Sequence, residues 1–189
     1  MISWFIARKL DTFEAHYDYD ATYMRELLGL GLSVLSPFHK ATALGNFRRG
    51  VSAAAWHAAK MVTLQAEDCG PCLQLVVQMA AEDGVPAEVI SDVLHRRLHR
   101  LPTEVALAVR FVDAVRARAP EADAIRAELL PLIGRPSIVS LAYAILSARL
   151  YPDLKFALGH GQTCSRVSLE GEVLWTPTGQ AHESREVAG

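Results

Sequence analysis

The chain has 189 residues, of which 51% are hydrophobic and 21% are charged. A chain of this length and composition can bury enough apolar surface to fold as one domain, which excludes wholesale disorder. It carries 19 Lys and Arg against 21 Asp and Glu, so no basic excess indicates a nucleic acid or an anionic membrane as a partner.

Apolar residues recur at helical spacing through most of the chain. Ser52 and Thr103 are residue types that cap helix N-termini, as is Asp20, and Gly84 is of the type that ends a helix. The pattern predicts helices over residues 21–28, 34–47, 53–66, 71–82, 86–94, 103–118, 121–130 and 136–150, with a further segment beyond Pro152 to residue 158. We therefore predict an all-α fold, a single-domain helical bundle of roughly seven or eight helices.

The composition changes after Gly159, where Gly, Ser, Thr and charged residues become frequent. We therefore divide the chain into a helical domain, residues 1–160, and a partly flexible C-terminal extension, residues 161–189. Residues 167–175 alternate between apolar and polar around a Glu-Gly pair, which predicts a small β-hairpin. From Thr176 onward we expect a loose tail.

Neither membrane insertion nor secretion is expected. The longest apolar run, residues 138–148, is interrupted by polar residues and falls short of the roughly 18 apolar residues of a membrane-spanning helix. Residues 1–10 lack the basic region of a secretory signal. The expected location is the cytoplasm.

The three cysteines are Cys69, Cys72 and Cys164, an odd number that does not suit a secreted disulfide framework. Cys69 and Cys72 enclose Gly70 and Pro71 at a predicted helix start. This spacing lets two sulfurs meet across one turn, and the positive end of the helix dipole stabilises a thiolate. The pair predicts a redox-active dithiol. The alternatives are a structural pair and a zinc site, which would need two more ligands.

Thioredoxins carry the same four residues after a buried strand, whereas the residues before Cys69 are strongly helical. The order of helix, acidic turn, dithiol and helix resembles the alkylhydroperoxidase D-like and carboxymuconolactone decarboxylase superfamily. The resemblance covers residues 55–94 and includes a dithiol helix hairpin at about 53–83. It implies an all-α homo-oligomer, a trimer or a hexamer.

The same resemblance implies a thiol-dependent oxidoreductase with an antioxidant role, which reduces peroxides or partner disulfides. It further implies a peroxiredoxin or another dithiol reductant as a partner. No Gly-rich phosphate loop is present, and we expect neither a cofactor nor a metal.

Both cysteines match the superfamily pattern, but three proton-relay positions do not. Peroxidase members carry a glutamate at the position of His57, and histidines at the positions of Pro71 and Val76. A valine cannot move protons, so another group must deprotonate the attacking thiol. We predict His57 as that group, with Lys60 on the same helix face as a second candidate.

Glu67 precedes the dithiol and is predicted to act either as a base or as a solvated acid near the helix end. The resemblance favours Cys72 as the attacking thiol and Cys69 as its resolving partner, whereas the helix dipole favours Cys69 as the attacker. Two other functions stay open. One is a non-catalytic or binding oligomer of the same fold with a vestigial dithiol, and the other is a carboxymuconolactone decarboxylase-like enzyme, against which the dithiol argues.

Two polar groupings have competing interpretations. The first grouping is Asp92, His95 and His99, whose helical spacing is that of a possible metal-binding face. The arginines beside them favour a solvated basic helix end instead. The second grouping is Tyr151, Lys155 and His160, which could line the dithiol pocket. The alternative is that Lys155 and His160 bind the last carbonyl groups of their helix.

Overall fold

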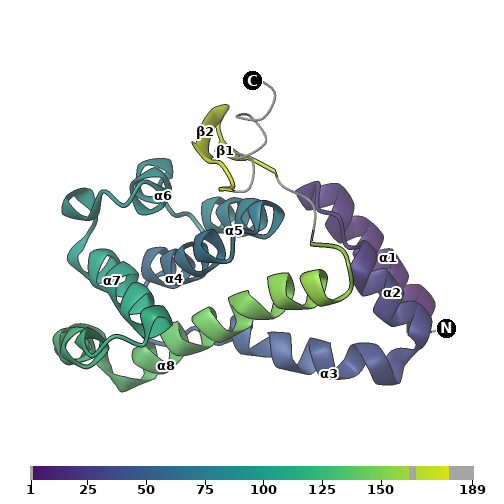
Figure 1. Ribbon diagram of the computed structural model, residues 1–189, viewed down its shortest axis with the longest axis horizontal. Helices are drawn as coiled ribbons and strands as arrows, with labels where there is room; N and C mark the ends of the chain where they lie inside the picture. Colours follow the sequence, from purple (N-terminus) through teal and green to yellow (C-terminus); the bar gives the residue numbers. More distant parts are fainter. Residues whose placement is uncertain (1, 162–164, 179–189) are drawn as a thin grey trace, which may run out of the picture.

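The computed structural model describes residues 2–161 and 165–178, which fold into eight α-helices, two 3-10 helices and one antiparallel strand pair (Figure 1). The helices are α1 (Ile2–Tyr17), α2 (Thr22–Leu30), α3 (Leu32–Thr42), η1 (Ala43–Asn46), α4 (Ala53–Ala66), α5 (Gly70–Glu82), α6 (Ala87–Leu94), η2 (Leu98–Arg100), α7 (Thr103–Ala117) and α8 (Glu121–Ala157). The strands are β1 (Val167–Leu169) and β2 (Glu172–Trp175). The predicted all-α class and the small hairpin are confirmed.

Helix α4 lies at the centre of the molecule, between α5, α7 and α8 (Figure 1). Ser52 caps its N-terminus as predicted, because its side chain accepts a hydrogen bond of 3.2 Å from the backbone N–H of Ala55. Nine of its 14 residues are buried, and they lie on every side of the helix. An Ala-rich helix that is apolar all round suits this position, since small side chains let neighbouring helices approach closely.

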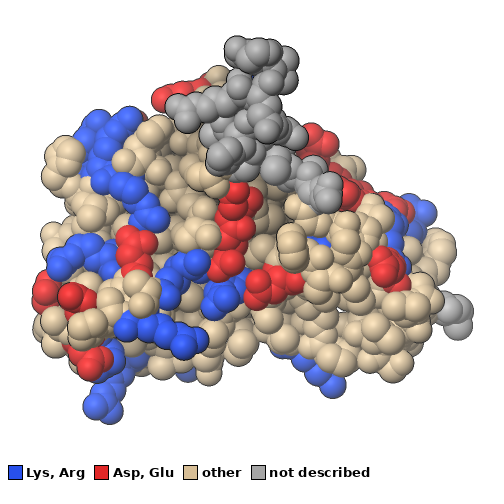
Figure 2. Space-filling model, viewed as in Figure 1, with Lys and Arg blue, Asp and Glu red and all other residues tan. Residues whose placement is uncertain are grey.

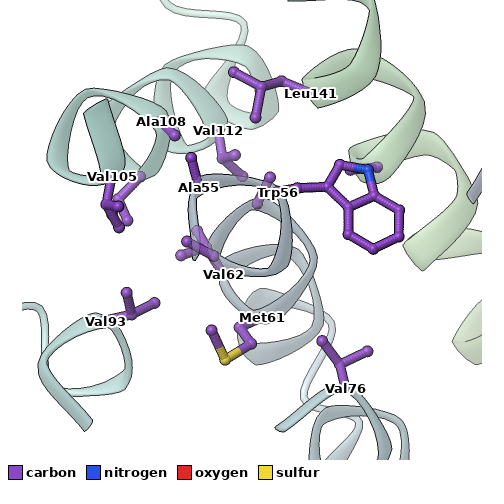
Figure 3. Close-up of a cluster of buried hydrophobic side chains, with 14 of the residues drawn as sticks. Ala55, Trp56, Met61, Val62, Val76, Val93, Val105, Ala108, Val112 and Leu141 are labelled. Atoms are coloured by element: carbon purple, nitrogen blue, oxygen red, sulfur yellow. The ribbon is translucent and has the colours of Figure 1, made fainter. Parts of the chain in front are cut away.

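The side chains of α4 are enclosed by those of four other helices. Figure 3 shows Met61 and its neighbours on α4 surrounded by Val112 of α7, Leu141 of α8, Val93 of α6 and Val76 of α5. All five side chains are buried. This single cluster is the main hydrophobic core, and it fixes the position of the α4–α5 hairpin.

A second, smaller hydrophobic cluster lies under α1 and α2, around Tyr19 and Tyr23. No helix is predicted from the sequence before residue 21, and the structure corrects this with α1. The available signal was the helical spacing of Leu10, Phe13 and Tyr17, which pack against this cluster.

Several helix boundaries differ from the prediction. Helix α8 continues through Pro152, whereas its non-helical residue Gly134 lies between the segments 121–130 and 136–150 that are predicted as separate helices; its φ of 75° lies in the left-handed region that glycine tolerates. Pro102, not Thr103, occupies the N-cap position of α7. Helix α2 begins one residue later than predicted, so Ala21 and not Asp20 is its N-cap residue, although Asp20 accepts a hydrogen bond of 2.9 Å from the backbone N–H of Thr22.

Helix α8 also contains an 18-residue window with a mean hydropathy of 1.6, of which 33% is buried. By length and composition this helix can cross a membrane, which corrects the expectation that no segment qualifies. One such helix indicates a membrane span only weakly, because core helices of soluble proteins meet the same criterion.

Charged side chains of both signs are interspersed over the face of the molecule drawn in Figure 2. Some form exposed ion pairs, such as Arg96 with Asp113 at 2.8 Å and Arg126 with Asp123 at 2.9 Å. Exposed pairs of this kind contribute about 0–1 kcal/mol each. The fold therefore depends on its core more than on these surface charges.

The central position of α4 leads to a stability prediction. Met61→Ala removes a fully buried side chain and leaves a cavity, so we expect the free energy of unfolding in urea to fall by about 2–5 kcal/mol. The control is Leu30→Ala on α2, whose side chain is 66% exposed and whose loss should change stability by less than about 0.5 kcal/mol. Equal losses in the two variants would contradict the central role of α4.

Candidate functional site

The two cysteines form a disulfide at the start of α5. Cys69 is the N-cap residue of the helix, and its Cα lies 5.4 Å from that of Cys72, within the range of about 4.4–6.8 Å that bridged cysteines show. Pro71 sits in the first turn, where its missing N–H costs no helical hydrogen bond. The sulfurs meet across one turn, as the spacing predicts.

The disulfide separates two cavities. Cys72 is only 3% exposed and lines a cavity of about 520 Å³. Cys69 is half-buried and lines a second cavity of about 340 Å³. A molecule in either cavity would therefore meet a different cysteine of the pair.

The larger cavity is lined by residues of α1, α2, α3, η1, α4, α5 and α8, and its walls are mostly apolar. Lys60 of α4 lines it together with Cys72. The Lys60 ammonium donates a hydrogen bond of 3.0 Å to the carbonyl oxygen of Gly45 and lies 3.4 Å from the ring centroid of Trp56. Burial lowers the pKa of Lys60 to about 8. The predicted second candidate base thus lies on the wall of the cavity that Cys72 faces.

The smaller cavity is more polar and is lined in large part by the end of α8 and the turn after it, which include Lys155 and His160. Lys155 is 4% exposed, lies 5.1 Å from the ring centroid of Tyr19, and has a pKa lowered by burial. His160 Nε2 lies 2.8 Å from Glu26 Oε2. Of the three residues weighed for a pocket role, Lys155 and His160 therefore line the Cys69 cavity, and Tyr151 lines the Cys72 cavity.

Glu67 also lines the smaller cavity, where its charge is balanced by two arginines. Its Oε1 lies 2.6 Å from Nη1 of Arg116 on α7 and 3.0 Å from Nε of Arg149 on α8. The carboxylate therefore ties the turn before the dithiol to two core helices. This contact suits a structural role at the site better than that of a free base.

The structure does not bring His57 to the sulfurs. Its Nε2 lies 2.9 Å from Oδ2 of Asp83, which follows the last residue of α5. Cys72 stands at the opposite end of that helix, roughly 16 Å away along its axis at 1.5 Å per residue. Burial lowers the pKa of His57, so the ring is held neutral beside the Asp83 carboxylate.

Residues of the C-terminal extension close over the start of α5, beside which Figure 1 shows β1 and β2. The Gln74 side chain donates to the Ser168 carbonyl at 3.0 Å and accepts the Ser168 N–H at 2.8 Å. Asp68 accepts hydrogen bonds of 2.9 Å from both the backbone N–H and the hydroxyl of Thr178. These contacts are not predicted from the sequence, because no pattern within residues 165–178 indicates which part of the protein they bind.

The other residues considered from the sequence lie away from the dithiol or outside the residues that the structure describes. Asp92 is buried and forms ion pairs with Arg97 at 3.1 Å and Arg100 at 3.3 Å. Within residues 2–161 and 165–178, no group of three His, Cys, Asp or Glu is placed to hold a metal ion. Cys164 and the predicted tail beyond residue 178 lie outside the described residues.

Comparison of the chain with protein-family models, with curated proteins and with solved structures found no match. These comparisons identify no family for the chain, so the resemblance of residues 55–94 to the alkylhydroperoxidase D-like superfamily stays a prediction from the sequence.

The docking of the C-terminal hairpin can be tested at Gly70. A Cβ at this position would collide with the carbonyl oxygen of Ser165, so Gly70→Ala should displace the strand pair. We expect faster amide hydrogen exchange across residues 167–175. The control is Gly29→Ala, because open space surrounds Gly29 on α2 and alanine should stabilise that helix by about 0.5–1 kcal/mol. Unchanged exchange in Gly70→Ala would contradict the close contact.

The buried His57 predicts a pH dependence of stability. Its folded pKa lies below the usual 6.5, so the unfolded chain binds more protons once the pH falls below that value. The free energy of unfolding should fall as the pH is lowered from about 7.5 to about 5.5, by at most about 1.4 kcal/mol per pH unit from this group. His57→Gln should flatten this slope, and His99→Gln, at an exposed position, should not. Equal slopes in all three proteins would exclude His57 as the cause.

Proposed function

We propose that this protein is a dithiol oxidoreductase, a divergent relative of the alkylhydroperoxidase D-like superfamily, that reduces peroxides or partner disulfides. One observation carries the proposal: Cys69 and Cys72 close a disulfide at a helix N-terminus, and each of the two residues lines a cavity. A structural pair sealed in the core would have no such access. Thiol–disulfide exchange requires that an attacking group can reach a sulfur.

In the proposed cycle, the thiolate of Cys72 attacks the terminal oxygen of a hydroperoxide. The O–O bond breaks, the alcohol leaves with a proton, and Cys72 becomes a sulfenic acid. The Cys69 sulfur then attacks the Cys72 sulfur, water leaves, and the disulfide forms. An external dithiol, such as a reduced protein partner, returns two electrons and two protons and is itself oxidised to a disulfide. With a partner disulfide as the substrate, the first product is a mixed disulfide in place of the sulfenic acid.

The charge at the site supports Cys72 as the attacking thiol. Lys60 places a positive charge on the wall of the cavity that Cys72 lines, and a positive charge in the same cavity favours a thiolate over a thiol. Val76, which stands where peroxidase members carry a histidine, lines the same cavity. Lys60 therefore supplies from α4 a polar group that Val76 cannot supply from α5.

A second candidate function is a binding oligomer in which the dithiol is vestigial. The distance of His57 from the sulfurs favours it, because the predicted relay then has no base at that position. The two candidates differ in one measurable property, which is whether the reduced dithiol turns over.

Turnover of the dithiol is tested by reducing the protein, removing the reductant, and adding cumene hydroperoxide or a small disulfide. We expect two thiols to be consumed per hydroperoxide as the Cys69–Cys72 bond reforms. Cys72→Ser should lose at least about a hundredfold in rate, and Cys69→Ser should accumulate a Cys72 sulfenic acid or mixed disulfide. Cys164→Ser is the control and should react like the natural sequence. Full activity of Cys72→Ser, or no thiol loss in any protein, would refute the proposal and favour the vestigial dithiol.

A further inference from the structure

The ionisable Lys, His, Asp and Glu side chains that line the larger cavity are all basic. Among the described residues that line it, the side chains able to carry a positive charge are Lys9, His39 and Lys60, and no Asp or Glu is present. Its volume of about 520 Å³ falls in the range of about 300–1,000 Å³ that small-molecule ligands occupy. The smaller cavity, by contrast, contains Glu67 and Asp153. The electrostatics of the larger cavity therefore favour an anion.

Lys60 is the most buried of these positive groups, and Asp83, the carboxylate that favours its charge, is itself paired with Arg48 and His57. Within the described part of the chain, no carboxylate lies within 4.0 Å of its ammonium. An ammonium has three N–H donors, and the Gly45 carbonyl takes one of them. A half-buried cation without a carboxylate partner is costly, and an anion in the cavity would reduce that cost.

The other polar side chains on the cavity wall include Ser147 and Asn46. The Ser147 hydroxyl donates a hydrogen bond of 3.2 Å to the carbonyl oxygen of Ala144, so its one proton is already used and Lys60 is the polar group with donors to spare. The rest of the wall is largely aliphatic and aromatic, and includes Leu10, Phe13, Met24, Leu35, Phe38, Leu75 and Met79.

We propose that the cavity binds an apolar molecule with a single carboxylate group, whose head is held by Lys60 and whose chain lies against the apolar wall. The arrangement suits this class because the cavity offers basic side chains, no carboxylate among its described residues and an otherwise largely apolar surface. The proposal goes beyond the dithiol chemistry, since binding requires no turnover of the sulfurs. It is therefore tested on the oxidised protein, in which the disulfide is closed.

The probe is decanoate, titrated by isothermal calorimetry at pH 6.5 into the oxidised full-length protein. Decan-1-ol and decylamine have the same chain with a neutral and a cationic head. We expect decanoate to bind at least about tenfold more tightly than decan-1-ol, and decylamine to bind more weakly than either. Equal affinity for decanoate and decan-1-ol would overturn the proposal without any variant having to fold.

Two lysine variants locate the head group. Lys60→Met should weaken decanoate binding at least about tenfold and leave decan-1-ol unchanged, whereas Lys40→Met, at an exposed position on α3, should alter neither. Unchanged decanoate affinity in Lys60→Met would overturn the assignment. Ala148→Phe, which adds bulk to the cavity wall, should weaken both ligands; if it weakens neither, the ligands bind elsewhere.

A pH series gives an independent readout. Decanoate affinity should fall as the pH rises from about 6.5 to about 9.5, because Lys60 loses its proton within this range. The other charged or titratable groups that act on it are Asp83, which favours its charge, and Arg48 and His57, which oppose it; Lys9 and His39 share the cavity wall. In Lys60→Met the fall should be small. A fall of the same size in that variant would assign the effect to Lys9 or His39 and overturn the role of Lys60.

Discussion

The burial of α4 on every side is the constraint on which the rest of the structure depends. A helix in this position must be narrow and mostly apolar, which the five alanines among residues 53–59 help to provide. Because α5 follows after a turn of three residues, it must lie antiparallel to α4 and in contact with it. Residues on one side of this helix pair then line a single cavity, and Leu64 and Cys72 are among them. The position of the dithiol is thus a consequence of core packing.

The same geometry gives the disulfide two different surroundings. Cys69 lies at the surface end of the turn, among Glu67, Lys155 and other polar groups, and Cys72 lies inside, beside apolar side chains and Lys60. Under the proposed chemistry, a small oxidant and a polar reductant need not compete for one space, because each reaches its own sulfur. The contacts of the C-terminal strands with the first turn of α5 place further chain beside this bond.

The features that the sequence predicts correctly are those decided within a few residues. Ser52 caps α4 because its hydroxyl reaches an N–H three residues away, and the sulfurs of Cys69 and Cys72 meet because one helical turn separates them. Partners from distant segments could not be predicted. Glu67 meets Arg116 and Arg149 only because α7 and α8 cross α4 at particular angles, and no local pattern encodes those angles. Helix α1 could have been predicted from the helical spacing of its apolar residues.

His57 and Lys60 show why a shared helix face does not guarantee a shared site. The two residues are three positions apart on α4, so they lie about 60° apart around the helix and about 4.5 Å apart along it. The short imidazole is held by Asp83 at the far end of α5, whereas the long lysine stem carries its ammonium over Trp56 into the cavity. The different position on α4 and the three additional methylenes of lysine thus decide which polar group shares a cavity with Cys72. A base predicted from spacing alone is therefore defined only to within about one helical turn, which is the difference between these two candidates.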